Sequence, residues 1–207
     1  MKDRTLIKKG VAAAKSGDFE TALREFKPLA EQGYAPAQYN LGLMYANGNG
    51  VEQDYKRAIK WYTLAAEQLD EYAQCNLGLM YANGEGVEQD YKRAVEWFTL
   101  AAEQGFANAQ DNLGLAYANG EGVEQDWKRA VEWFTLAAEQ GYGRAQHNLG
   151  AMYYQGQGVS QDYKRAVEWF TLAAEQAVAE AQCNLGLMYV SGHGVPEDYE
   201  TAIKWYT

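Results

Sequence analysis

Histidines and cysteines are the first residues to consider for chemistry in this 207-residue chain, because it has only two of each. His147 and His193 lack the spaced cysteine, histidine or acidic companions that a zinc site requires. Neither stands in a recognisable serine–histidine–aspartate setting. Cys75 and Cys183 occupy the same place in two distant repeats of the array described below, so no disulfide within the chain is expected. We therefore predict no catalytic residue, no metal site and no cofactor.

Paired glycines could indicate a phosphate-binding loop, and Gly48-Asn49-Gly50 is the first of several such pairs. However, no predicted strand precedes the pair, the third glycine of the dinucleotide fingerprint is missing, and no Lys-Ser follows. Gly48 is instead expected to end a helix in the left-handed conformation, and Gly50 to allow a second sharp change of direction. Val51 should then fold back against the end of a helix pair. The pair is interpreted as a structural turn.

Amides and leucines at a fixed spacing are the stronger candidates for recognition. An asparagine recurs every 36 residues from Asn40, and a leucine three positions later recurs with it, except that Ala151 replaces the leucine once. An amide donates and accepts at once, so it suits a peptide backbone. The alternative is that the asparagines bridge adjacent repeats, since a buried amide must find partners either way. The candidate partner-binding residues are Asn40, Leu43, Asn47, Asn76, Leu79, Asn83, Asn112, Leu115, Asn119, Asn148, Tyr154, Asn184 and Leu187.

The elements that must position these residues are predicted from the same repeat. A fixed period between about 20 and 50 residues is the mark of a solenoid. Each repeat is predicted to form two helices, the first from about Pro36 to Asn47 and the second after Asp54, a good N-cap. Gly42 and its equivalents lie within the first helix at a cost of about 1 kcal/mol each. Their recurrence predicts that the two helices approach closely there.

The chain divides by this pattern into an N-terminal helix pair and five repeats. Residues 1–34 are predicted to form a shorter capping pair, whose second helix, Phe19 to Gln32, should be kinked or loosened at Pro28. The repeats are placed at 35–70, 71–106, 107–142, 143–178 and 179–207, the last one truncated. The truncation suggests a fragment, and the nearly identical repeats fit either recent duplication or consensus design.

This pattern resembles the Sel-1-like repeat, a 36-residue relative of the tetratricopeptide repeat. The residues that carry the resemblance recur at steps of 36 over about residues 35 to 207: Ala37, Leu41, Gly42, Tyr45, Gly48, Gly50, Val51, Asp54, Ala58, Trp61, Tyr62, Ala65 and Ala66. The resemblance implies an all-α fold, a right-handed superhelix of antiparallel helix pairs in which the first helix of each pair lines the concave side. It also implies an adaptor that holds other proteins or peptides.

Charge and hydropathy restrict the partners. The formal net charge is −10, with 18 basic and 28 acidic residues, which argues against nucleic acid as the main partner. No stretch approaches the roughly 18 apolar residues of a membrane span. Gly10-Val11-Ala12-Ala13-Ala14 is too short for a signal-peptide core, so the chain as written is expected to be cytoplasmic. A periplasmic or secreted location would follow if a leader had been removed.

The functional hypothesis is a non-enzymatic scaffold that binds a protein or an extended peptide in a concave groove. Positions that differ between repeats are expected to choose the partner: Tyr39, Asp111, His147, the two cysteines, Tyr72, Asn108, Arg144 and Glu180. One alternative, by analogy with cysteine-rich relatives, is a binder or weak hydrolase of cell-wall or β-lactam-type molecules. This chain lacks their cysteine pairs. A further alternative is self-association through the open C-terminal end.

Overall fold

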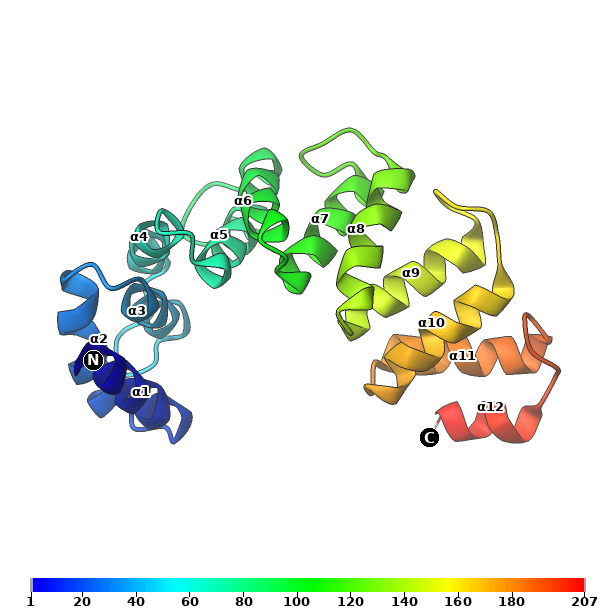
Figure 1. Ribbon diagram of the computed structural model, residues 1–207, viewed down its shortest axis with the longest axis horizontal. Coiled ribbons are helices and arrows are strands. Elements are labelled where there is room, and N and C mark those ends of the chain that lie inside the picture. Colours follow the sequence, from blue (N-terminus) through cyan, green and yellow to red (C-terminus); the bar gives the residue numbers. More distant parts are fainter. Residues whose placement is uncertain (1, 207) are drawn as a thin grey trace. The chain divides into compact units, whose positions relative to one another are not determined.

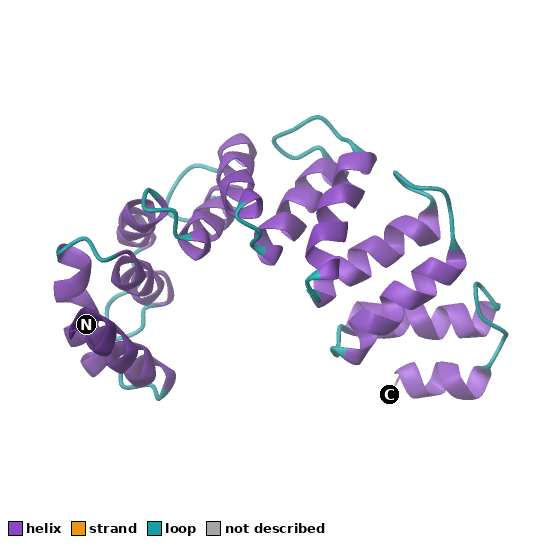
Figure 2. Cartoon of the chain, viewed as in Figure 1, coloured by secondary structure: helices purple, strands orange, loops and turns teal. Residues whose placement is uncertain are grey.

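The computed structural model describes residues 2–206, which form twelve helices and no strand (Figures 1 and 2). The N-terminal pair consists of α1 and α2, and each later pair forms one repeat. The bounds are α1 Lys2–Lys15, α2 Phe19–Glu31, α3 Ala35–Asn47, α4 Tyr55–Ala66, α5 Glu71–Asn83, α6 Tyr91–Glu103, α7 Ala107–Asn119, α8 Trp127–Glu139, α9 Gly143–Gln155, α10 Tyr163–Glu175, α11 Ala179–Ser191 and α12 Tyr199–Tyr206. The prediction of an all-helical repeat fold is confirmed. Residues 1 and 207, the outer ends of the predicted division, lie outside the described residues.

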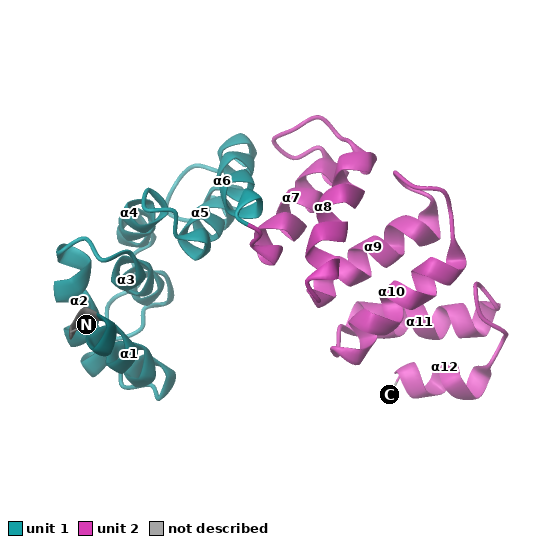
Figure 3. Cartoon of the chain, in the orientation of Figure 1, with its two compact units in different colours: residues 1–104 teal, residues 105–207 magenta. Residues whose placement is uncertain are grey.

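The helices form two compact units, residues 1–104 and residues 105–207 (Figure 3). The first unit holds α1 to α6 and the second holds α7 to α12. Within each unit, every helix packs against the next one along the chain, so each repeat buries one face against its neighbour. Helix α2 continues through Pro28 to Glu31, so the proline does not end it.

The two glycines of each inter-helix turn have different functions. Gly48 ends α3 in the left-handed conformation, with a φ of 70°, and its N–H donates to the carbonyl of Met44. Gly86, the second glycine of the next turn, also has a positive φ, and a Cβ there would lie 2.6 Å from the Cβ of Tyr55. Tyr55 is the first residue of α4, in the preceding repeat. The first glycine therefore ends a helix, whereas the second lets the turn pack directly on the neighbouring repeat.

The glycines within the first helices face aromatic rings. A Cβ added to Gly42 would lie 2.7 Å from the ring of Tyr62, and one added to Gly150 would lie 2.8 Å from the ring of Phe170. Such distances are well inside van der Waals contact, so each ring occupies the space that a side chain would need. The predicted close approach is confirmed, and its cause is an aromatic side chain of the second helix.

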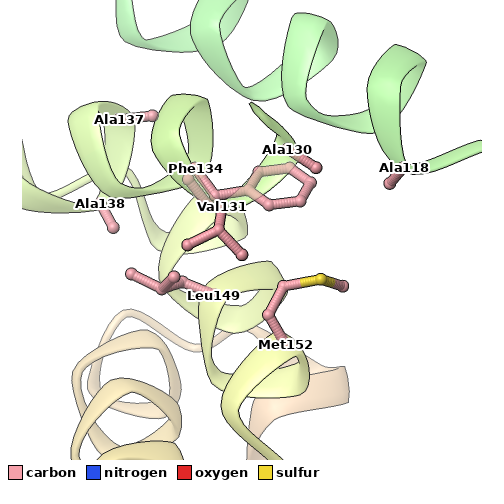
Figure 4. Packing of buried hydrophobic residues seen from close by; sticks show 9 residues of the cluster. Ala118, Ala130, Val131, Phe134, Ala137, Ala138, Leu149 and Met152 are labelled. Carbon is pink, nitrogen blue, oxygen red and sulfur yellow. The ribbon is translucent and has the colours of Figure 1, made fainter. Parts of the chain in front are cut away.

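The core consists mainly of alanines, leucines and methionines, with one large buried aromatic residue in each of the first five helix pairs. In the second unit, Phe134 packs with Val131, Leu149 and Met152, residues of α8 and α9 (Figure 4). Val51 packs against the cluster that α1, α2 and Met44 form, as expected from its place after the paired glycines. The small alanines let helices approach closely, and this packing fixes the first helix of each repeat on its neighbour.

Candidate partner-binding site

The first helices of successive repeats enclose a pocket between repeats one and two. This repeat 1/2 pocket has a volume of about 200 Å³ and lies on α3, α4 and α5 with the start of the following turn. Its lining residues are Leu43, Ala46, Asn47, Tyr62, Asn76, Leu79, Met80, Asn83 and Glu85. Five of the predicted partner-binding residues are therefore brought together here: Leu43, Asn47, Asn76, Leu79 and Asn83.

A second pocket lies between repeats four and five, in the other unit. This repeat 4/5 pocket has a volume of about 140 Å³ and lies on α9, α10 and α11. Its lining residues are Ala151, Tyr154, Gln155, Phe170, Asn184, Leu187 and Met188. Each of them has an equivalent three repeats earlier that lines the repeat 1/2 pocket. The two pockets are thus the same site of the repeat, and predicted residues Tyr154, Asn184 and Leu187 belong to it.

The repeat 1/2 pocket combines polar and apolar groups. The phenol of Tyr62 lies at its base, and burial raises the pKa of that phenol, while a hydrogen bond with Asn76 opposes the rise. Glu85 contributes a carboxylate at the rim, where Asn83 donates to it at 3.4 Å. Hydroxyl, amide and carboxylate groups therefore line this pocket together with Leu43 and Leu79.

The repeat 4/5 pocket has different residues at its base and rim. Phe170 replaces the equivalent tyrosine at the base, so no hydroxyl is present there. Ala151 replaces a leucine, and Tyr154 replaces an alanine at the rim. The ring of Tyr154 packs on Tyr163 at 5.3 Å, and Tyr163 stacks on His193 at 4.6 Å with an interplanar angle of 6°. These ring contacts hold Tyr154 as a wall of the pocket.

The asparagines of the first helices also link adjacent repeats. The amide of Asn148 donates to the carboxylate of Asp111 at 2.8 Å, and Asn184 lies 3.0 Å from the ring nitrogen Nε2 of His147. Asn76 forms a hydrogen bond with Tyr39. In all three cases the partner is the residue 37 positions earlier, in the preceding repeat. These asparagines therefore stabilise the repeat interface at the same place where Asn76 and Asn184 line the pockets.

Asp111 is a buried acid at that interface. Its side chain is completely buried and forms an ion pair with Arg144, which also donates to Asn112 at 2.7 Å. Burial raises the pKa of Asp111, and the charge of Arg144 and its hydrogen bond oppose the rise. Asp111 and Cys75, two of the variable positions expected to choose the partner, are both buried, so neither side chain can contact a partner directly. An influence of these two residues on the choice of partner stays a prediction.

The remaining predicted residues lie on the same helices with other contacts. Asn40 donates to the carbonyl of Pro36 at 2.7 Å, and Asn112 donates to Asn108 within α7. Leu115 is partly buried against the core of α8 and α9. Asn119 is exposed and is the last residue of α7. For these four, the proposed contact with a partner stays a prediction.

Sequence reasoning missed the bases of the two pockets, Tyr62 and Phe170, and the pairing of Asp111 with Arg144. Tyr62 and Phe170 belong to the apolar face of the second helix, so their spacing indicates only core packing. A signal for the ion pair was present, because Asp111 and Arg144 are each the only charge of their sign at their repeat position. Sequence spacing alone does not show that these two side chains meet.

His147 and the two cysteines differ in burial and in their contacts. His147 packs on Phe170 at 5.6 Å, and burial lowers the pKa of its imidazole. Cys75 is buried, Cys183 is exposed, and neither forms a disulfide bond. Over residues 2–206, no group of three or more histidine, cysteine, aspartate or glutamate side chains is arranged to hold a metal ion. None of the helices within that range has the length and apolar character to cross a membrane.

The helix pairs, their turns and their pockets define a tetratricopeptide-like helical solenoid. The profile of the Sel1 repeat matches residues 35–68, 71–106, 107–142, 143–178 and 179–207. The chain therefore belongs to the Sel1 repeat family, whose members are generally modules for protein–protein interaction and generally non-enzymatic scaffolds. No match was found among curated proteins.

Solved structures of bacterial repeat proteins resemble this chain. A protective antigen of uropathogenic Escherichia coli strains is 40% identical, with a TM-score of 0.90 over 98% of this chain. A Sel1 repeat protein from Oxalobacter formigenes is 36% identical, with a TM-score of 0.91 over 97% of this chain. Cysteine rich protein B of Helicobacter pylori is 25% identical, with a TM-score of 0.50 over 62%. The chain spans 44%, 80% and 92% of these three proteins, respectively.

Proposed function

We propose that this protein is a non-enzymatic scaffold that binds an extended peptide, or an extended segment of a protein, across the first helices of its repeats. The observation that carries the proposal is the recurrence of one pocket in both units, built from equivalent residues. Each pocket combines exposed or half-buried leucines with side-chain amides. Leucines provide apolar contact area, and amides can pair with the donors and acceptors of a peptide backbone.

Charge plays a small part in this recognition. Helix α3 carries no charged residue, α5 carries only Glu71, and α11 carries only Glu180. The net charge of −10 is therefore carried by the turns between helices, whereas the acidic and basic residues of the second helices nearly balance. A partner of the first-helix face should bind through shape, apolar contact and hydrogen bonds, with a weak dependence on salt.

The test is a selection of linear peptides from a random phage-displayed library on the immobilised protein, followed by calorimetric titration of the selected peptides. Leu187→Arg places a charge in the repeat 4/5 pocket, where the leucine is 55% exposed. The matched control is Leu172→Arg, because Leu172 is 43% exposed on the second helix α10 of the same unit. We expect Leu187→Arg to weaken binding by about tenfold or more and the control to leave it unchanged. Binding that only the control weakens would overturn the proposal.

A further inference from the structure

The two equivalent pockets differ in chemistry, and this difference indicates what each accepts. Relative to the repeat 1/2 pocket, the repeat 4/5 pocket has Phe170 for Tyr62, Ala151 for Leu43 and Tyr154 for Ala46. Its base is dry, since Phe170 and Met188 are each only 2% exposed. Its rim is open, since Leu187 and Tyr154 are exposed.

The size of the repeat 4/5 pocket suits one side chain. Its volume of about 140 Å³ is close to the roughly 150 Å³ of an engineered apolar cavity that binds benzene. It is well below the roughly 300 Å³ at which pockets for drug-sized ligands begin. The volume therefore fits a single aromatic or large aliphatic group.

The absence of charged residues from the lining of the repeat 4/5 pocket disfavours charged occupants. No charged side chain lines the repeat 4/5 pocket, whereas Glu85 lines the repeat 1/2 pocket. A cation or carboxylate placed on Phe170 and Met188 would lose its hydration without a counter-charge, which is costly. The polar lining groups that could serve a backbone are the amides of Gln155 and Asn184 and the hydroxyl of Tyr154, all of them uncharged.

We propose that the repeat 4/5 pocket is an anchor site for one uncharged apolar side chain, phenylalanine or leucine, of an extended peptide. This inference rests on the proposed function, since it names the group that the scaffold selects. The repeat 1/2 pocket, with a phenol at its base and a carboxylate among its lining groups, retains the same group more weakly.

Methionine methyl groups provide a reporter for each pocket. Met188 lines the repeat 4/5 pocket and Met80 lines the repeat 1/2 pocket. Met152 and Met44 lie in core clusters and serve as internal references. The protein would be labelled with ¹³C-methyl methionine and titrated with N-acetyl-phenylalanine amide, and separately with N-acetyl-lysine amide. We expect a saturable shift of Met188 with the first probe only, and a smaller response of Met80.

Two substitutions test whether the shift of Met188 arises from binding in the repeat 4/5 pocket. Both introduce residues that other repeats carry at the equivalent positions. Ala151→Leu fills the pocket with the leucine found at positions 43, 79, 115 and 187, so the fold should tolerate it. We expect it to abolish the shift of Met188. Tyr154→Ala restores the alanine of positions 46, 82 and 118 and should weaken binding without filling the pocket. Helicity measured by circular dichroism verifies that each variant is folded.

The outcomes separate the inference from the proposed function. If selected peptides bind and depend on Leu187, but the phenylalanine probe leaves Met188 unchanged, the anchor site is refuted and the scaffold function stands. A Met188 shift that persists in Ala151→Leu also refutes the anchor site. A shift that Ala151→Leu abolishes, without any peptide that depends on Leu187, supports the chemistry of the pocket and contradicts the proposed function.

Discussion

The repeat 1/2 and repeat 4/5 pockets show how a solenoid can vary its chemistry without changing its backbone. Both lie between the first helices of adjacent repeats and use equivalent positions. Three exchanges, Leu43 for Ala151, Ala46 for Tyr154 and Tyr62 for Phe170, change the base and the rim, and the carboxylate of Glu85 lines only the repeat 1/2 pocket. Because each repeat contacts only its neighbours, one repeat can change its pocket while the others keep theirs.

The asparagine hydrogen bond that joins adjacent repeats also has different partners in the two units. In the first unit, Asn76 meets the neutral hydroxyl of Tyr39. In the second unit, Asn148 meets the carboxylate of Asp111, which also pairs with Arg144. One position per repeat thus decides whether the interface is neutral or charged, and the following predictions test this difference.

The largest effect is expected at the charged interface. Arg144→Ala leaves the buried carboxylate of Asp111 without its cation, and should lower the free energy of unfolding by about 3 kcal/mol. Arg129→Ala, which removes an exposed partner of Asp126, should cost under about 1 kcal/mol. Urea denaturation followed by circular dichroism measures both.

Arg144→Ala should lower the free energy of unfolding by an amount that depends on pH, and this dependence identifies the cause of the loss. Burial raises the pKa of Asp111 above its ordinary 3.8, and removal of Arg144 raises it further. The loss should therefore shrink as the pH falls and Asp111 becomes protonated, because a neutral carboxyl group does not need the cation. A loss that is the same at acidic and neutral pH would show that Arg144 acts through packing.

The neutral interface, which contains Tyr39 and Asn76, should lose stability at alkaline pH. Burial raises the pKa of Tyr39 to about 12 from its ordinary 10.0. The unfolded phenol ionises first, so the folded state loses stability as the pH rises from 10 to 12, by on the order of 1–2 kcal/mol. The native methyl signal of Met80 should then decrease before that of Met188. Tyr39→Phe should reduce the difference, and the remainder should come from Tyr62, whose pKa burial also raises. Tyr199→Phe, at a 62% exposed position, is the control.

The smallest effect concerns the turn between repeats, where Leu69 and Gly141 occupy equivalent positions. Leu69 has a φ of 67°, whereas Gly141 at the equivalent turn has a φ of 83° and nothing within 4 Å of an added Cβ. Leu69→Gly should raise the free energy of unfolding by roughly 0.5–1 kcal/mol, and Gly141→Leu should lower it by about 1 kcal/mol. Thermal denaturation measures both changes. If both substitutions change the free energy of unfolding in the same direction, side-chain contacts rather than backbone conformation dominate at this turn.

Much of the fold was predictable because its determinants are local. The 36-residue period, the aspartate N-caps and the paired glycines place each helix, and Asp54 does accept from the N–H of Arg57 at 3.0 Å. The candidate site was predictable only in part. Leu43, Asn76, Leu187 and Asn184 were placed on one face by helical spacing, and they do line pockets.

The sequence by itself therefore determined the repeat, its two helices and the face that carries amides and leucines, since hydrophobic spacing and turn residues act within a few positions along the chain. Only the tertiary structure decided that Phe170 and Tyr62 form the bases of two unlike pockets, and that Asp111 is buried against Arg144. The physical reason is packing between repeats. Side chains more than 30 positions apart share one volume, and which of them fills it depends on how closely the helices approach.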